Sequence, residues 1–166
     1  ASINGAVAGA AEDLTKDFQL LHAYGKKNDP PKPHPNYAAL PYIDDMAGAL
    51  AAADLVVCRS GAMTVAEVSA AGLPAIYVPL PHGNGEQALN SRELVEAGAA
   101  VQIADAELGA DRLIEEVRAI LDDPERLKSM TQAAAQSKAG DAANIIADRI
   151  ATRVQDAELQ AGKKDK

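Results

Sequence analysis

The stretch that decides the fold runs from Asp54 to Val78 and reads DLVVCRSGAMTVAEVSAAGLPAIYV. It opens with an apolar run of strand length over 54–58 and passes through a turn of small residues into a helical segment, 63–71. Gly72 and Pro74 end that helix, because glycine adopts the left-handed conformation and proline cannot continue a helix. A second apolar run follows directly. Strand, helix and strand in this order predict a parallel β-α-β unit.

Further strands and helices alternate on both sides of this unit. Short apolar runs predict the remaining strands at 18–24, 37–43 and 99–103, the first as a buried parallel strand. Apolar residues at helical spacing predict the remaining helices: 2–16 with Ser2 as N-cap, 46–53, 86–96 ended by Gly98, 113–121, one from Pro124, and one marked by Ile145, Ile146, Ile150 and Val154. The sequence therefore predicts an α/β fold, a parallel sheet with flanking helices and right-handed crossovers. In such sheets ligands bind beyond the carboxyl ends of the strands.

The composition limits the classes of partner. The 166 residues carry 16 Lys and Arg against 24 Asp and Glu, a formal net charge of −8. An acidic chain lacks the basic surface that nucleic acids and anionic lipids require, so we expect no nucleic acid and no membrane contact from this chain. No apolar run reaches the roughly 18 residues that span a bilayer. A lone Cys58 cannot form an internal disulfide, which favours a reducing, cytoplasmic location.

Several kinds of chemistry lack their motif. His22, His34 and His82 do not have metal-ligand spacing, and one cysteine makes no zinc pattern, so the residues predict no metal site. No G-x-G-x-x-G followed by a later acid occurs, nor does the G-x-S-x-G turn of hydrolases. Asp44 and Asp45 are sequence neighbours rather than a facing pair of glycosidase carboxylates.

The loop after the first strand of the central unit, 58–64, is the strongest candidate site. The free amides at the start of the following helix carry partial positive charge and suit a phosphate. Thr64 can add a hydroxyl, and Glu67, one turn on, can accept hydrogen bonds from a ribose diol. A capping box, Thr64-x-x-Glu67, explains the same residues without a ligand. The spacing alone favours neither interpretation.

Two other loops also follow predicted strands. In 79–87, Gly83 and Gly85 make a turn before Glu86 and Gln87, whose side chains suit sugar hydroxyls, with Asn90 close behind. A plain polar loop, with the acid favoured by the helix dipole, explains that segment as well. In 42–46, the extended backbone at Ile43 can pair with a flat base while Met46 packs on it. Taken alone, however, this loop favours the simpler interpretation of two capping aspartates.

Taken together, three runs resemble the C-terminal domain of the MurG family, in the form typical of its actinobacterial branch. They are CRSGAMTVAE at 58–67, AGLPAIYVPLP at 71–81 and GNGEQALN at 83–90. MurG proteins are UDP-N-acetylglucosamine:N-acetylmuramyl-(pentapeptide) pyrophosphoryl-undecaprenol N-acetylglucosamine transferases. The resemblance implies a Rossmann-like parallel sheet with flanking helices that forms one half of a GT-B glycosyltransferase, the half that holds the nucleotide sugar. It covers nearly the whole chain, and residues 42–90 carry most of its specificity.

The resemblance assigns a subsite to each loop. The backbone of Ile43 would read the uracil with Met46 beside it. Ala62, Met63 and Thr64 would hold the diphosphate at the helix start.

The ribose and sugar subsites follow from the same comparison. Glu67 would bind the ribose diol, while Glu86 and Gln87 would contact the GlcNAc hydroxyls with Asn90 behind them. Glu86 stands where many members carry Gln, and an ionised acid accepts hydrogen bonds but cannot donate them.

The implied reaction is an inverting transfer of GlcNAc from UDP-GlcNAc to lipid I, which makes lipid II in peptidoglycan synthesis and so serves cell shape and division. By the same resemblance, the reaction needs no metal or other cofactor. Lipid I and the catalytic base would belong to an N-terminal domain, so we expect no residue of this chain to act as the base and this chain alone to be inactive. We expect its full-length parent to be peripheral on the cytoplasmic face of the membrane. A non-catalytic nucleotide-sugar-binding module, another GT-B transferase, or a UDP-GlcNAc epimerase stays open as an alternative.

The chain begins at Ala1 rather than Met, with a helix and no strand before it. We therefore expect residues 1–154 to form the UDP-GlcNAc-binding domain with its first strand missing, and residues 155–166 to form a tail.

Overall fold

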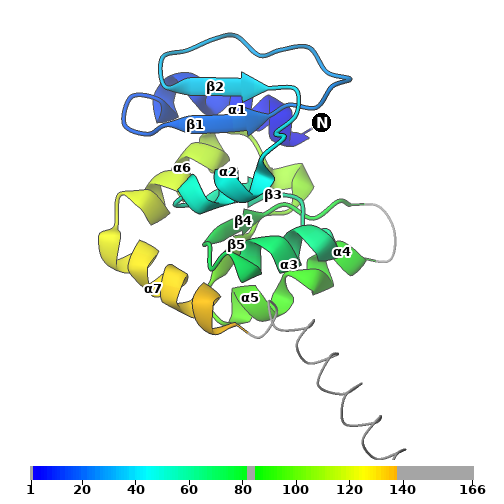
Figure 1. Ribbon diagram of the computed structural model, residues 1–166, viewed down its shortest axis with the longest axis vertical. Helices are drawn as coiled ribbons and strands as arrows, with labels where there is room; N and C mark the ends of the chain where they lie inside the picture. The colour runs from blue at the N-terminus through cyan, green and yellow to red at the C-terminus, as the bar shows by residue number, and fades with distance from the viewer. Residues whose placement is uncertain (1, 82–84, 138–166) are drawn as a thin grey trace, which may run out of the picture.

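The structure is a computed structural model that describes residues 2–81 and 85–137. Its helices and strands alternate as the sequence predicts (Figure 1). They are, in chain order, α1 (Ser2–Leu14), β1 (Leu20–Ala23), β2 (Tyr37–Leu40), α2 (Met46–Ala52), β3 (Val56–Cys58), α3 (Ala62–Ala70), β4 (Ala75–Tyr77), α4 (Glu86–Asn90), α5 (Arg92–Glu96), β5 (Ala100–Gln102), the 3₁₀ helix η1 (Asp105–Glu107), α6 (Ala110–Leu121) and α7 (Pro124–Gln136).

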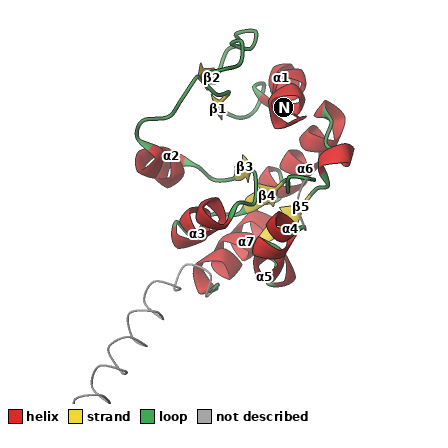
Figure 2. Ribbon diagram, turned by 90° about the vertical axis from the view of Figure 1, so that its right-hand side faces the viewer, coloured by secondary structure: helices red, strands yellow, loops and turns green. Residues whose placement is uncertain are grey.

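The strands form two parallel sheets rather than one. β1 pairs with β2, and β4 lies between β3 and β5. Figures 1 and 2 show the small sheet with α1 at one end of the molecule and the three-stranded sheet with α3, α4, α5 and α7 at the other. Parallel pairing and flanking helices confirm the predicted class. The predicted strand ahead of residue 1 concerns chain outside this sequence and stays a prediction.

Burial separates the two sheets. All three residues of β4 are completely buried, whereas β1 alternates between buried and exposed and leaves Leu21 47% exposed. The prediction of a buried strand at 18–24 is therefore wrong in its burial. β1 has one strand neighbour among the described residues, so only part of its surface is covered.

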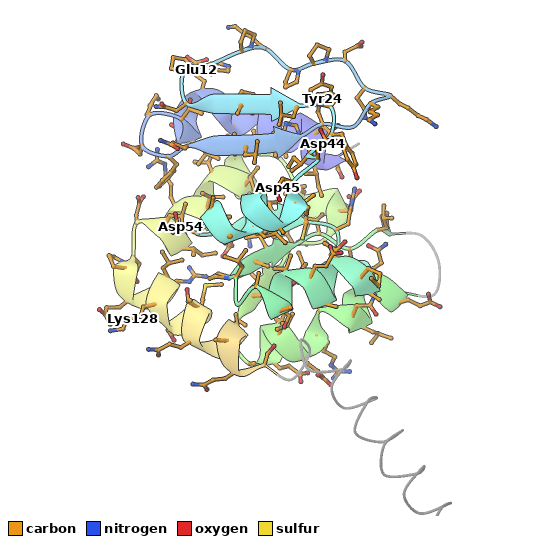
Figure 3. The ribbon with its side chains drawn as sticks, viewed as in Figure 1. Glu12, Tyr24, Asp44, Asp45, Asp54 and Lys128 are labelled. Atoms are coloured by element: carbon orange, nitrogen blue, oxygen red, sulfur yellow. The ribbon has the colours of Figure 1, made fainter. Side chains whose placement is uncertain are left out.

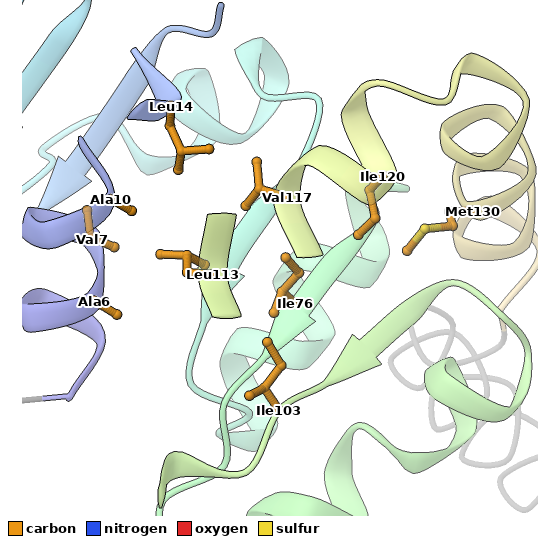
Figure 4. Close-up of a cluster of buried hydrophobic side chains, with 10 residues drawn as sticks. All are labelled: Ala6, Val7, Ala10, Leu14, Ile76, Ile103, Leu113, Val117, Ile120 and Met130. Carbon is orange, nitrogen blue, oxygen red and sulfur yellow. The ribbon is translucent and has the colours of Figure 1, made fainter. Parts of the chain in front are cut away.

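The main core lies where α1, α6 and the three-stranded sheet meet (Figure 4). Small residues on one face of α1, Ala6 and Ala10, let it approach α6 closely, and Leu113 and Val117 of α6 fill the contact. Ile76 of β4 lies beneath them with no exposed surface. A second cluster, which includes Val65, Val68, Tyr77, Leu94 and Ala134, packs α3, α5 and α7 on the other face of the sheet. The three-stranded sheet is thus covered on both faces.

Helix ends follow their predicted signals, with two exceptions. Gly72 and Gly98 have φ of +67° and +75° just beyond helix ends, a conformation that glycine adopts without strain. The predicted helix 86–96 is split at Ser91 into α4 and α5. Ser2 lies inside α1 and does not act as the predicted N-cap, because its hydroxyl hydrogen-bonds Asp105 and Arg59 instead.

The structure tests only some of the predictions for the C-terminal residues. α7 begins at Pro124 as expected, and the Asp123 carboxylate accepts hydrogen bonds from the amides of Glu125 and Arg126 at 3.1 Å. The last predicted helix and the domain boundary at residue 154 lie outside the described residues. Within 2–81 and 85–137, no helix is long and apolar enough to cross a membrane.

Candidate functional site

The loops that leave β3 and β4 meet at one hollow. It has a volume of about 450 Å³ and is lined by Gly61, Ala62, Glu86, Gln87, Leu89 and Asn90. Residues from the two strongest predicted loops therefore lie on facing walls, one at the start of α3 and the other on α4. This position, beyond the carboxyl ends of parallel strands, is where ligands bind in open α/β sheets.

The start of α3 forms the first wall. Gly61 is the N-cap and contributes no side-chain hydrogen bond, and the first intrahelical bond joins the Val65 amide to the Gly61 carbonyl at 2.9 Å. The amides of Ala62, Met63 and Thr64 thus have no acceptor within the helix and carry its positive end. The capping-box interpretation is wrong, because Thr64 is the third helical residue rather than the N-cap.

Two further groups adjoin this wall. Ser60 is fully buried, and its Oγ has no hydrogen-bond partner among the described residues. A buried hydroxyl without a partner is costly, so a polar group that reached it would be favoured. Glu67 is exposed one turn into α3, and its carboxylate makes no hydrogen bond within 2–81 and 85–137. Glu67 does not line the hollow, but its carboxylate is not engaged by another described residue.

The start of α4 forms the second wall. Gly85 caps this helix with φ of +75°, which a residue with a side chain rarely adopts. Glu86 is exposed. The Gln87 Oε1 accepts the Leu80 amide at 3.1 Å, so its Nε2 donor group is the part left for a ligand. The Asn90 Nδ2 donates to the Ser60 carbonyl at 3.0 Å and connects the two walls, which makes Asn90 a structural residue.

The third predicted loop, 42–46, does not line the hollow. Asp45 is the N-cap of α2 and accepts the Gly48 amide at 2.8 Å, so the capping interpretation of this aspartate is confirmed (Figure 3). Ile43 is half-buried, and Met46, the first residue of α2, is 44% exposed. The structure therefore brings Ala62, Glu86 and Gln87 together but leaves Ile43 and Met46 apart from them.

Arg59 was not among the predicted site residues, yet it has the densest set of polar contacts near the hollow. It forms an ion pair with Asp105 and hydrogen bonds to Ser2 and to the carbonyls of Val78 and Pro79. An arginine directly after an apolar strand was the available signal. Its partners lie 19 to 57 residues away in sequence, so no local pattern reveals them.

Within residues 2–81 and 85–137, neither Cys58 nor His22 provides a reactive group at the hollow. Burial raises the pKa of the Cys58 thiol to about 12, which keeps it protonated and unreactive. Burial lowers the pKa of His22, which lies between Tyr37 and Asn4, away from the hollow. The described residues hold no cluster of three or more His, Cys, Asp or Glu that could bind a metal ion.

Comparison with known sequences places these features in a family. The family model described as "Glycosyltransferase family 28 C-terminal domain" matches residues 1–146. A Corynebacterium efficiens protein is 57% identical over 152 residues, which cover 91% of this chain and 42% of that protein. It is named UDP-N-acetylglucosamine--N-acetylmuramyl-(pentapeptide) pyrophosphoryl-undecaprenol N-acetylglucosamine transferase, as is a Mycolicibacterium paratuberculosis protein 51% identical over 98% of this chain and 41% of its own. The chain thus spans less than half the length of these curated relatives.

Solved structures agree with this assignment. The crystal structure of Acinetobacter baumannii MurG superposes with a TM-score of 0.76 at 29% identity, covering 91% of this chain and 46% of that one. The calicheamicin glycosyltransferase CalG4, at 24% identity and a TM-score of 0.62 over 88% of this chain and 40% of its own, shares the fold. The fold is therefore the Rossmann-like half of a GT-B glycosyltransferase, and the chain belongs to the glycosyltransferase family 28 C-terminal domains.

Proposed function

We propose that this chain is the donor-binding domain of an inverting glycosyltransferase that moves GlcNAc from UDP-GlcNAc to lipid I. The observation that carries the proposal is the hollow between α3 and α4, because it joins an anion-binding helix start to side chains suited to sugar hydroxyls. The transferase names of the relatives support the choice of donor and acceptor.

The diphosphate subsite is the best supported part. α3 has nine residues, and its unpaired first-turn amides at Ala62, Met63 and Thr64 would hydrogen-bond the phosphate oxygens. Met63, the second residue of this turn, is 74% exposed, so the turn lies at the surface. The buried Ser60 hydroxyl next to this turn offers one more donor.

The remaining subsites extend from this turn. Glu67 would accept both ribose hydroxyls, one helical turn further along α3. Gln87 would donate through Nε2 to a sugar hydroxyl, and Glu86 would accept from another. The backbone of Ile43 would pair with the uracil, with Met46 packed beside the base, which requires the ligand to extend beyond the hollow.

The chemistry we propose needs no metal or other cofactor. The departing UDP would carry its new charge against the N-terminus of α3, a fixed dipole that needs no rearrangement during the reaction. The base that activates the acceptor hydroxyl and the site for lipid I would both lie in another part of the whole enzyme. This chain alone should bind donor weakly and transfer nothing.

The cellular role follows from that reaction. The whole enzyme would make lipid II on the cytoplasmic face of the cell membrane as a peripheral protein, and so serve cell wall synthesis, cell shape and division. The surface of this chain has a net negative charge, which disfavours direct contact with anionic lipid.

Titration with UDP-GlcNAc, followed by backbone amide shifts, tests the donor site. We expect the shifts to cluster at residue 43, residues 62–64 and residue 87. Shifts elsewhere would contradict the proposed pocket. UDP-GalNAc and UDP-glucose should bind more weakly than UDP-GlcNAc. Equal affinity for all three nucleotide sugars would contradict the proposed selectivity for GlcNAc. Multiple turnover of a lipid I analogue by the 166-residue chain would refute the expected inactivity.

A further inference from the structure

Arg59 lies across the carboxyl ends of the three-stranded sheet. It leaves the end of β3, and its side chain is 25% exposed. Its guanidinium donates to the carbonyls of Val78 at 3.1 Å and Pro79 at 3.3 Å, where the chain leaves β4. It also pairs with Asp105, beyond β5, and donates to the Ser2 hydroxyl of α1 at 2.8 Å. Only the planar fork of arginine can reach so many separate acceptors at once.

These contacts are part of a closed ring of bonds around the hollow. Arg59 holds the two carbonyls at the end of β4, and the next residue, Leu80, donates its amide to Gln87 on α4 at 3.1 Å. Asn90, on the same helix, donates to the Ser60 carbonyl at 3.0 Å, and Ser60 is bonded to Arg59 through the chain. The ring therefore joins the wall at the start of α3 to the wall on α4.

Arg59 itself does not line the hollow. We propose that it is a positioning residue that sets the separation of the two walls, so that one ligand engages the diphosphate turn and the sugar side chains together. The inference rests on the proposed function and deepens it. A nucleoside diphosphate alone needs only the α3 wall, whereas a nucleotide sugar needs both. Loss of Arg59 should therefore weaken the sugar-dependent part of the affinity and spare the nucleotide part.

The test compares UDP with UDP-GlcNAc by calorimetry on Arg59→Lys and Arg59→Gln. A lysine keeps the charge but cannot bridge the same acceptors. We expect UDP affinity to stay within about twofold and UDP-GlcNAc affinity to fall by about tenfold, the scale of one or two lost hydrogen bonds. Equal weakening of both ligands, or of neither, would overturn the proposal.

Arg118→Lys is the matched control. Arg118 is similarly part-exposed and pairs with Asp13 and Asp17, which lie in and just after α1, away from the hollow. The Arg118→Lys substitution should lower stability slightly and leave the ratio of the UDP and UDP-GlcNAc affinities unchanged. A change in that ratio equal to the one at Arg59 would show a general loss of rigidity and overturn the positioning role.

Hydrogen exchange without ligand separates this inference from the proposed function. The Leu80 amide should exchange about tenfold faster in Arg59→Lys than in the unsubstituted chain, because the Arg59 guanidinium no longer holds the loop that carries Leu80. It should not change in Arg118→Lys. Unchanged exchange at Leu80 would contradict the ring whether or not nucleotides bind. If the unsubstituted chain binds neither UDP nor UDP-GlcNAc, the proposed function fails. The exchange result would still decide whether Arg59 holds the loop at Leu80.

Discussion

The two sheets of this protein are built from strands of similar length, but they differ in burial and in the chemistry at their ends. β4 has a strand on either side and helices on both faces, and it is wholly buried. In the part of the chain that the structure describes, β1 has one strand neighbour, and it leaves Leu21 half-exposed. The candidate site lies at the end of the three-stranded sheet. Loops that leave a sheet covered on both faces are held in fixed positions and can keep a binding geometry. Loops that leave a half-covered sheet are held less firmly.

Removing volume from the central strand should have the largest effect. Ile76→Ala empties a site with no exposed surface and should cost about 2–5 kcal/mol of unfolding free energy. Leu21→Ala in β1, at 47% exposure, should cost less than about 1 kcal/mol. Urea denaturation measures both. Similar losses at the two positions would remove the distinction between the sheets.

The next effect concerns the ligand rather than stability. Glu67→Ala should weaken UDP binding by about 1–3 kcal/mol, the scale of hydrogen bonds to a charged group. It should leave the melting temperature unchanged, because Glu67 is exposed and caps nothing. Glu93→Ala, an exposed acid on α5, is the control and should change neither quantity. A fall in stability without a change in affinity would instead give Glu67 a structural role.

A smaller effect is expected where α1 meets α6. Arg118 pairs with Asp13 and Asp17, and the pKa of Asp13 is lowered chiefly by its hydrogen bond to Arg118. These groups are solvated, so Arg118→Met should lower stability only slightly, and less as salt is added. Thermal melts at low and high salt measure this. A large, salt-independent loss would mean that the arginine stabilises α1 by packing instead.

The smallest effect that we expect is on the pH dependence of stability, and it involves a histidine in the small sheet. The Asn4 Oδ1 can only accept, so the His22 Nε2 carries the proton and its Nδ1 accepts from the Tyr37 hydroxyl at 2.7 Å. Burial lowers the pKa of His22, so the unfolded chain takes up a proton first on acidification. Stability should therefore be full above about pH 6.5, the usual histidine pKa, and should fall as the pH drops below it.

His22→Gln should flatten that part of the stability profile, measured by denaturation at several pH values. Ile76→Ala, in the other sheet, should keep the same pH dependence at a lower level. A profile unchanged by the histidine substitution would assign the acid sensitivity to other groups.

Much of the candidate site was predictable from sequence because its signals are local. The small-residue turn at 60–62 after an apolar strand predicted the open helix start, and the polar cluster at 86–87 predicted the second wall. Thr64 was ambiguous, since one pattern fits a capping box and a phosphate turn alike, and only the observed helix start separates them. Asn90 was expected near a sugar but bonds the Ser60 carbonyl, a contact across 30 residues.

The sequence by itself determined the order of strands and helices, because apolar periodicity and the conformational limits of Gly72, Pro74 and Gly98 act over a few neighbouring residues. Only the tertiary structure decided which strands are central, and that Arg59 meets Asp105, 46 residues away. Such contacts depend on which distant segments pack side by side. That packing is set by the whole core rather than by the residues that flank the site.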